Sequence, residues 1–493
     1  MKHKIKFAAL LLIASVAFMF SCNQQPKSLV EATKTGKFDE LTQLPFPENQ
    51  PSKEASARLY DELHFQRAVQ VYLWSIGAMN MVAMRDGQAA ALGAGNNVLA
   101  IWKDRPNSKM LATTANPDVI YGLAFLDLKD GPLVLEAAPQ MQGLLDDFWH
   151  RPLIDVGLAG PDQGKGGKFL LLPPGFTGET PSGYYIVKSP TYSVFLFLRA
   201  FLVDGKTDAG VKLLEQSRIY PLSQQENPPA MKFPNGSEVV ADMDFKRDLR
   251  YFESLAEFFN HEPVTPEDMA MRGMAASLGI IKGQPFKPDE RMKAILNSAA
   301  DVAYKMATVI SYDSPVEITK VYPDRNWMKG FLGGSPIFKE ESYTDLDAQV
   351  SMFHKAYSTT PAMVLQMPGK GSQYLGVYRD TDGDFLSGGK SYRFHMPANV
   401  PAANYWSIVL YDADTRALLD NGQPFPSIAS NSNLKPNADG SADVYFGPTA
   451  PKGAANWIKT VPGRGYFGLM RLYSPTKVFY DQTWKPGDVE KVK

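Results

Sequence analysis

Polar side chains set among apolar and aromatic residues mark two stretches where chemistry could take place. The first is Asn116-Pro117-Asp118-Val119-Ile120-Tyr121, and the second runs from Asp146 to Arg151 and is followed by Asp155. Carboxylates beside aromatic rings suit a site for a small molecule or a sugar, because the acid orients the ligand while the ring stacks on it. The same residues also suit a buried hydrogen-bond network that fixes loops, so both interpretations stay open.

A similar mixture of residue types recurs near the C-terminus, around Trp406 and Arg471. The candidate ligand-binding or catalytic residues are therefore Asn116, Asp118, Tyr121, Asp155, Trp406, Asp412 and Arg471. A general base among them, such as Asp118 or Asp155, would need a buried carboxyl group with a raised pKa, within reach of a substrate.

The residue spacing in other candidate motifs does not match the known metal-binding, phosphate-binding or hydrolase patterns. Asp380–Asp384 has its glycine too early for a calcium-binding EF-hand loop, so a charged hairpin tip is the better interpretation. Gly160–Gly167 lacks the hydroxyl residue that follows the lysine of a phosphate-binding loop. The histidines show no metal-ligand spacing, and no serine-hydrolase elbow is present. We therefore expect no metal and no cofactor.

Cys22 is the only cysteine, and its position is typical of a lipoprotein cleavage site. A basic stretch, Met1–Lys6, and an apolar run, Phe7–Phe20, precede it, as in a secretory signal. That run is shorter than the roughly 20 apolar residues of a membrane span. We predict a signal peptide over residues 1–21, with Cys22 carrying lipid, and a protein anchored in the cell envelope, on the periplasmic face or at the outer membrane. An ordinary signal peptide with an incidental cysteine is the alternative.

Composition narrows the class of protein. The chain has 493 residues, a formal net charge of −1, 44% hydrophobic and 21% charged residues, which is typical of a folded protein. Without a clustered Lys/Arg footprint, nucleic-acid binding is not expected. The expected partners are the membrane, through the N-terminal lipid, and a small-molecule ligand.

The predicted elements alternate between helical and strand-rich regions. Residues 22–58 are polar and typical of a tether. Apolar spacing of three and four predicts a helix over residues 61–85. Short apolar runs broken by Gly and Pro predict the strands of a mainly antiparallel sheet, at Val119–Leu128, Pro132–Ala137, Lys168–Leu172, Tyr184–Val187 and Ser193–Leu202. Two helices of the middle region are expected to start near Thr265 and Asp289.

Strands return after about residue 330. Asp382-Gly383 and Asp439-Gly440 between them are typical hairpin turns. No internal repeat with a period of about 20–50 residues is present.

The first candidate segment and two glycine-rich stretches resemble a known family. Asn116–Tyr121, Gly157–Asp162 and Pro173–Gly175 resemble the bacterial domain of unknown function numbered 1254. The C-terminal part is similar to the companion domain numbered 1214, on marks that include Gly371–Leu375, Tyr405–Ile408, Asp443–Gly447, Asn456–Ile458, Arg471–Tyr473 and Thr483–Pro486. Val119 replaces the threonine usual in the first family.

The resemblance implies an α+β multidomain fold: an Ig-like β-sandwich, a helical middle domain and a C-terminal jelly-roll-like β-sandwich. The expected boundaries are residues 59–220, 221–330 and 331–493. The resemblance transfers no catalytic residue, because the family has no agreed activity.

Three functions fit these residues. The first is a lipid-anchored envelope protein that binds a small polar or carbohydrate-like ligand between its β domains. The second is an envelope hydrolase or lyase that uses carboxylate acid/base chemistry. The third is a structural or assembly component without a ligand pocket.

Overall fold

The structure, a computed structural model, describes residues 36–314, 319–332 and 334–492. The predicted signal peptide, Cys22 and the first part of the predicted tether lie outside these residues. The described residues up to His64 and those from Phe65 onward form two units. In the first, part of the predicted tether is helical, with α2 (Lys37–Thr42), a 3-10 turn (Pro47–Asn49) and the start of α3 (Lys53–Leu92). Among the described residues, no helix combines the length and apolar character needed to cross a bilayer.

The helix predicted over residues 61–85 is confirmed and is longer in both directions. It ends before Gly93, whose φ of +91° is the left-handed conformation that commonly terminates a helix. Gly87 allows the helix to approach the chain at Asp242, since a Cβ at this position would lie 2.1 Å from the Asp242 carbonyl oxygen. The second half of α3 is thereby packed into the larger unit.

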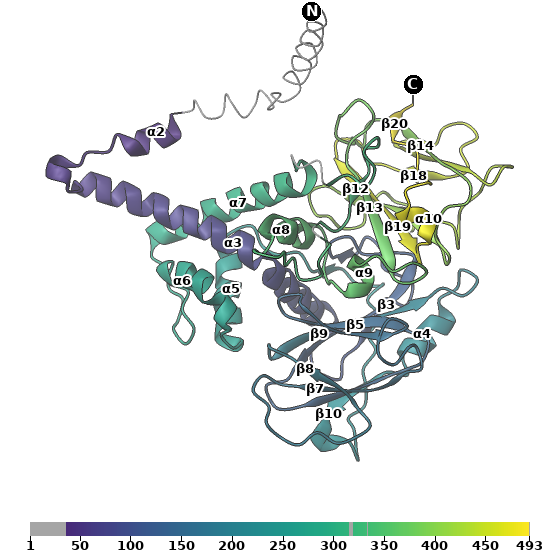
Figure 1. Cartoon of the computed structure of the whole chain (residues 1–493), viewed down its shortest axis with the longest axis horizontal. Helices are drawn as coiled ribbons and strands as arrows, with labels where there is room; N and C mark the ends of the chain where they lie inside the picture. Colours follow the sequence, from purple (N-terminus) through teal and green to yellow (C-terminus); the bar gives the residue numbers. More distant parts are fainter. Residues whose placement is uncertain (1–35, 315–318, 333, 493) are drawn as a thin grey trace, which may run out of the picture. The chain divides into compact units, whose positions relative to one another are not determined.

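The first strand-rich region is a sandwich of two sheets (Figure 1). One sheet has the order β1-β3-β9-β5-β6 and the other the order β10-β4-β7-β8. The strands are β1 (Ala100–Ile101), β3 (Val119–Asp127), β4 (Leu133–Ala137), β5 (Gln142–Asp147), β6 (Pro152–Gly157), β7 (Gly167–Leu172), β8 (Tyr185–Lys188), β9 (Ser193–Phe201) and β10 (Arg218–Pro221). The pair β7–β8 is parallel, and the other pairs in the two sheets are antiparallel.

The C-terminal region is a second sandwich of the same design. Its sheets have the orders β12-β13-β19-β15-β16 and β18-β17-β14-β20. The strands are β12 (Met328–Lys329), β13 (Ser372–Val377), β14 (Tyr392–Met396), β15 (Trp406–Asp412), β16 (Ser427–Ala429), β17 (Ala442–Gly447), β18 (Trp457–Lys459), β19 (Tyr466–Tyr473) and β20 (Glu490–Lys491).

The two sandwiches share one strand topology. Each strand of the first has a counterpart in the second, β1 with β12, β3 with β13, and so on to β10 with β20. The agreement extends to direction, because β17–β18 is parallel just as β7–β8 is. The chain therefore contains one fold twice, although its sequence shows no internal repeat with a period of about 20–50 residues.

Helices fill the middle of the chain, as predicted. They are α5 (Leu249–His261), α6 (Met269–Ser277), α7 (Glu290–Tyr312), α8 (Leu346–Lys355) and the short α9 (Pro361–Val364). The predicted start at Asp289 is confirmed, since its side chain accepts a hydrogen bond from the Met292 N–H at 2.8 Å. The predicted α+β multidomain architecture, with strand-rich ends and a helical middle, is thus confirmed.

One of the two Asp-Gly turns closes a short hairpin, as predicted: around Asp382-Gly383, Arg379 and Phe385 pair antiparallel, and the Asp380 N–H donates to the Asp384 carbonyl at 2.9 Å. Around Asp439-Gly440 the described residues form a tight turn, in which the Asn437 N–H donates to the Ser441 carbonyl at 2.7 Å, without paired strands on its two sides. Gly383 and Gly440 adopt the positive φ that the turn chemistry indicates, +86° and +81°. However, the strands β13 and β14 that flank the first turn belong to different sheets, as do β16 and β17 on either side of the second. A tight turn fixes the local reversal of the chain but does not determine which strand the next one pairs with.

Alternation along the strands creates two faces on each sandwich. In β9, Leu196 and Leu198 pack in the core of the first sandwich, whereas Phe195 and Phe197 point to a separate core that also contains the helices. In β19, Met470 packs within the second sandwich, while Phe467 and Leu469 belong to the shared core. The outer faces of the two five-stranded sheets therefore contribute to one hydrophobic core.

Candidate functional site

A cavity lies where these outer faces and the segment around α8 and α9 meet. It is lined by residues of both sandwiches and of the connecting segment: Thr114, Asn116, Tyr121, Phe197, Arg199, Gly330, Phe331, Met352, Lys355, Ala356, Tyr357, Ser358, Met363, Tyr374, Tyr378, Phe467, Leu469, Arg471 and Tyr473. Its volume is about 60 Å³. One water requires about 10–15 Å³ on this scale, so the cavity accommodates on the order of five water-sized groups.

Two arginines occupy equivalent positions in the two sandwiches. Arg199 on β9 is paired across the sheet with Tyr121 on β3. Arg471 on β19 is paired in the same way with Tyr374 on β13. Because side chains alternate along a strand, each arginine lies on the outer face of its sheet and thus at the cavity. The duplicated fold therefore supplies one Tyr–Arg pair from each side.

Both arginines are buried without an acidic partner. Arg199 is 6% exposed and Arg471 is 4% exposed. Among the described residues, no carboxylate forms an ion pair with either guanidinium; the Asp155 carboxylate acts on Arg199 from beyond ion-pair distance, and the Nε of Arg199 has no hydrogen-bond partner. Arg471 is held more firmly, since it donates to the Tyr411 hydroxyl and to the Thr114 carbonyl, both at 2.7 Å. Burying a charge without compensation is expensive, so the arrangement favours an anion in the cavity.

Neutral hydroxyl and amide groups complete the polar lining. The backbone N–H of Asn116 donates to the Tyr121 hydroxyl at 2.8 Å, and its side-chain amide donates to the Tyr473 hydroxyl at 2.6 Å. Burial raises the pKa of Tyr473, which keeps its hydroxyl neutral. The hydroxyl of Ser358 is buried without a hydrogen-bond partner among the described residues, whereas the Tyr357 hydroxyl interacts with that of Tyr121. The Ser358 hydroxyl is available to a bound ligand.

Lys355, the last residue of α8, is a third cation in the lining. Its Nζ lies 3.4 Å from the carbonyl oxygen of Ser311, near the C-terminal end of α7, and 5.4 Å from the centre of the Tyr378 ring. Both a helix C-terminus and an aromatic face favour a positive charge. Burial lowers the pKa of Lys355 to about 8, so the amine is mostly protonated at pH 7.

Asp118 and Asp155 lie close to the cavity but are not among the described residues that line it. Asp118 is buried, and one of its oxygens accepts a hydrogen bond from the Ser427 hydroxyl at 3.1 Å. Burial raises the pKa of both carboxyl groups, and the charge of Arg199 opposes this shift at Asp155. The structure thus places these acids behind the lining rather than at the cavity surface.

Trp406 and Asp412 lie elsewhere in the second sandwich. Trp406 is part of that sandwich's own core. Asp412 forms an ion pair of 2.7 Å with Arg464 and accepts hydrogen bonds from the backbone N–H groups of Asp414 and Thr415. Of the seven candidate residues, the structure therefore brings Asn116, Tyr121 and Arg471 together at the cavity.

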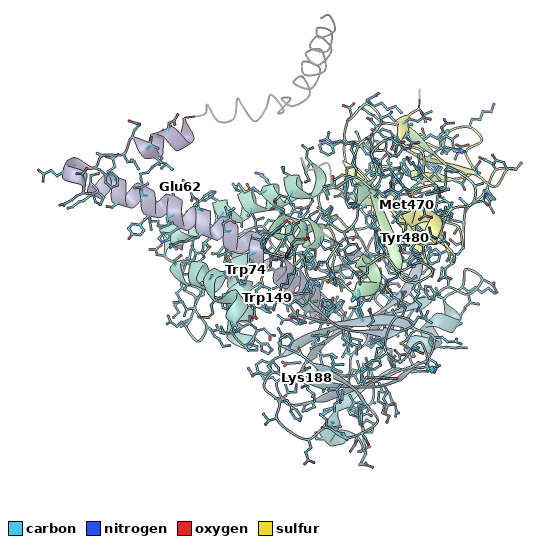
Figure 2. All side chains as sticks on the ribbon, in the orientation of Figure 1. Glu62, Trp74, Trp149, Lys188, Met470 and Tyr480 are labelled. Atoms are coloured by element: carbon cyan, nitrogen blue, oxygen red, sulfur yellow. The ribbon has the colours of Figure 1, made fainter. Side chains whose placement is uncertain are left out.

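The segment from Asp146 to Arg151 is a hydrogen-bonded loop packed against α3. One oxygen of Asp147 accepts from the backbone N–H groups of Trp149 and Arg151, both at 2.8 Å. The rings of Trp149 and Trp74 lie 4.8 Å apart (Figure 2). Burial raises the pKa of Asp147 to about 6. These contacts support the interpretation of this segment as a network that fixes a loop.

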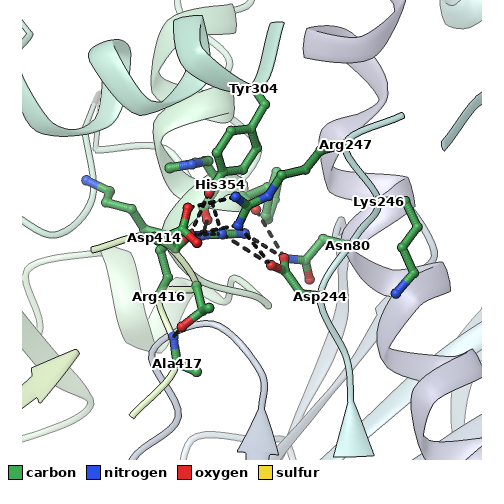
Figure 3. A network of polar contacts seen from close by, with 12 residues as sticks. Asn80, Asp244, Lys246, Arg247, Tyr304, His354, Asp414, Arg416 and Ala417 are labelled. Atoms are coloured by element: carbon green, nitrogen blue, oxygen red, sulfur yellow. Dashed lines mark hydrogen bonds and ion pairs between the residues drawn. The ribbon is translucent and has the colours of Figure 1, made fainter. Parts of the chain in front are cut away.

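A fully buried arginine network adjoins the cavity wall. Arg416 donates to both oxygens of Asp244, at 2.6 and 3.3 Å, and to the Tyr304 hydroxyl at 2.7 Å (Figure 3). It also donates to the carbonyls of His354 and Asp414. Its own carbonyl accepts from the backbone N–H of Thr114, which lines the cavity. The network connects the second sandwich with α7, α8 and the chain before α5.

The described residues contain no cluster of His, Cys, Asp or Glu side chains suited to a metal ion. The three aspartates of the stretch 380–384 instead surround Lys491, whose Nζ lies 3.2 Å from Asp380 and 2.7 Å from both Asp382 and Asp384.

Sequence reasoning missed several residues of the cavity, above all Arg199, Lys355, Tyr374 and Tyr473. Arg199 carries a detectable signal, because it is the one charged residue in the otherwise apolar strand Ser193–Phe201. The other three carry no comparable signal.

Comparisons with known proteins agree with this domain arrangement. Residues 96–221 match the family DUF1254, and residues 371–477 match the family DUF1214, each described as a protein of unknown function. The predicted resemblance and its order along the chain are confirmed. No protein with a curated function matches the chain.

Two solved structures share features with this chain. The VPA0106 protein from Vibrio parahaemolyticus has 16% sequence identity and a TM-score of 0.53, over 87% of this chain and 100% of that one. An uncharacterised protein from Burkholderia cenocepacia has 14% identity and a TM-score of 0.40, over 89% of this chain and 96% of that one. The first similarity supports the fold alone.

Proposed function

We propose that this chain, which joins a DUF1254 domain to a DUF1214 domain, binds a small organic anion between its two β-sandwiches. The observation that carries the proposal is the pair of buried arginines, Arg199 and Arg471, at equivalent positions and without acidic partners. An anionic ligand would supply the missing negative charge through charge-assisted hydrogen bonds, which are the strong ones in proteins. A neutral sugar would leave both guanidinium groups without an ion-pair partner, so the expectation of a polar ligand narrows to an anion.

The rest of the lining supports an organic ligand of small size. Phe197, Phe331, Met352, Met363, Phe467 and Leu469 supply apolar surface beside the cations. Binding sites for small molecules commonly combine such apolar walls with a few converging polar groups. The volume of about 60 Å³ restricts the buried part of the ligand to a short chain.

A binding role is favoured over the two alternatives. The enzyme hypothesis relied on Asp118 or Asp155 as general base, and neither is among the described residues that line the cavity. A purely structural role gives no reason to bury two unpaired guanidinium groups beside a cavity, since apolar residues of similar volume are often as stable or more so.

Short carboxylates should stabilise the protein, whereas their neutral amides should not. Acetate and propionate would be compared with acetamide and propionamide at fixed ionic strength, by thermal unfolding. A ligand present at about 100 times its Kd adds about 2.7 kcal/mol to the free energy of unfolding, so the unfolding temperature should rise with carboxylate concentration. Equal effects of acid and amide, or none above sodium chloride, would overturn the proposal.

We further propose that the protein is anchored in the cell envelope by lipid on Cys22. The support is the order of basic stretch, apolar run and cysteine at the N-terminus. Replacing Cys22 by serine should move the protein from the membrane fraction to the soluble fraction while leaving its fold unchanged. Ser21→Ala is the matched control, because it changes the neighbouring residue and keeps the cysteine. An unchanged distribution of Cys22→Ser would contradict the anchor.

A further inference from the structure

The cavity contains two buried guanidinium groups without an ion-pair partner, and they come from symmetric positions. The Tyr–Arg pairs Tyr121–Arg199 and Tyr374–Arg471 occupy corresponding strands of the duplicated fold. Both guanidinium groups interact electrostatically with the same hydroxyls, those of Tyr121, Tyr374 and Tyr473. The two arginines therefore share one compartment while each belongs to its own sandwich.

Lys355 does not add a third charge that needs an anion. Its ammonium group already faces the carbonyl oxygen of Ser311 at the end of α7 and the face of Tyr378. A helix C-terminus carries partial negative charge, which partly compensates the lysine. Asp155 acts electrostatically on Arg199, and Asp118 acts on Arg471, but neither acid forms an ion pair with its arginine. Each guanidinium therefore still lacks a direct acidic partner, and the cavity can accept two negative charges.

We propose that the ligand is a dianion, a short-chain dicarboxylate, with one carboxylate bound by Arg199 and the other by Arg471. This inference rests on the proposed anion-binding function and specifies its ligand class. A carboxylate matches the planar fork of a guanidinium in a bidentate geometry. A monocarboxylate would compensate one arginine and leave the other buried without a counter-charge.

The two arginine side chains differ in how firmly hydrogen bonds to the protein hold them. Arg471 is fixed by its bonds to Tyr411 and Thr114, whereas Arg199 retains an unpartnered Nε. The Arg199 side chain is therefore free to adjust to the spacing of the second carboxylate. The unpartnered hydroxyl of Ser358 offers a further hydrogen bond to a carboxylate oxygen.

The test compares acids of matched length and different charge. Titration calorimetry of the full chain would use malonate and succinate as dianions, propionate and butyrate as monoanions, and sulfate as a compact dianion, all at one ionic strength and near pH 7.5. At least one dicarboxylate should bind ten times or more tightly than the monocarboxylate of equal chain length. Methionine at either arginine should then remove this preference while still allowing a monocarboxylate to bind.

The outcomes distinguish a failure of the dicarboxylate inference from a failure of the proposed anion-binding function. Equal binding of mono- and dicarboxylates, or tighter binding of sulfate than of every dicarboxylate, overturns the dicarboxylate inference but retains an anion site. Binding of none of these anions overturns both. Arg272→Met serves as control for the variants, because Arg272 is also buried, at 9% exposure, but lies on α6 outside the described lining. Arg199→Lys, which keeps the charge, provides a second measurement if a methionine variant does not fold.

Discussion

Methionine in place of Arg199 should strongly weaken dicarboxylate binding and leave the protein at least as stable as the wild type. The guanidinium is buried, has no acidic partner and has an unpartnered Nε among the described residues, so its removal breaks no ion pair. Replacing buried charges by apolar groups of similar volume often stabilises proteins by about 1–4 kcal/mol. Loss of a charged contact to a ligand costs about 2–5 kcal/mol of binding free energy, so affinity should fall at least about 30-fold.

Urea unfolding and titration calorimetry measure the two effects separately. A residue that serves only the fold would, when replaced, lower stability and leave the affinity of the folded protein intact. Arg272→Met is again the matched control: Arg272 donates to the Pro263 carbonyl and lies over the Phe259 ring, so its replacement should change stability without changing affinity. Unchanged affinity in Arg199→Met would remove Arg199 from the site.

The strands and helices of this fold are largely visible in the sequence because they depend on local patterns. Short apolar runs predicted β3, β4, β7, β8 and β9, and a hydroxyl or carboxylate cap predicted helix starts such as Asp289. Strands β5 and β6 were missed, since their acids Asp146, Asp147 and Asp155 interrupt the apolar pattern. Burial of those acids depends on contacts with distant segments, such as the Thr359 N–H that donates to Asp146.

The duplication of the sandwich could not be predicted, because the constraint it imposes is on strand order and not on residue identity. Strands β9 and β19 have different core residues, Leu196 and Leu198 in one and Met470 and Leu472 in the other. Any branched or flexible apolar side chain of similar volume fills such a core. Arg199 and Arg471 are the positions where the two strands agree in an unexpected residue type, and their correspondence becomes visible only through the pairing register.

The residues of the candidate site were likewise only partly predictable from the sequence. Trp406 and Asp412 have the composition of a binding site, yet the pairing of Asp412 with Arg464 and the packing of Trp406 make them part of the second sandwich. Asn116, Tyr121 and Arg471 have a similar composition and reach the cavity. Sequence proximity cannot distinguish these cases, because which face of a sheet meets the other sandwich is decided by long-range packing.

Methionine in place of Arg416 should destabilise the larger unit by about 3–5 kcal/mol, the usual effect of breaking a buried ion pair from one side. Arg416 is fully buried and donates to Asp244, Tyr304 and two carbonyl oxygens, so its replacement removes all of these hydrogen bonds together. Unlike Arg199, it has an acidic ion-pair partner, and its removal leaves the Asp244 carboxylate with only the longer contact to Arg247, at 3.6 Å. The midpoint of urea unfolding measures the loss.

A double-mutant cycle with Asp244→Asn identifies the cause of that loss. If the weakly paired Asp244 carboxylate dominates, Arg416→Met combined with Asp244→Asn should be more stable than Arg416→Met alone, with a coupling free energy of about 0.5–3 kcal/mol. Arg393→Met is the matched control, since Arg393 pairs with Glu490 at the surface and exposed pairs contribute at most about 1 kcal/mol. Additive effects in the cycle would instead assign the stabilisation to the carbonyl contacts of Arg416. In that case the guanidinium acts as a clamp between chain segments, through His354 and Asp414, rather than as the partner of one acid.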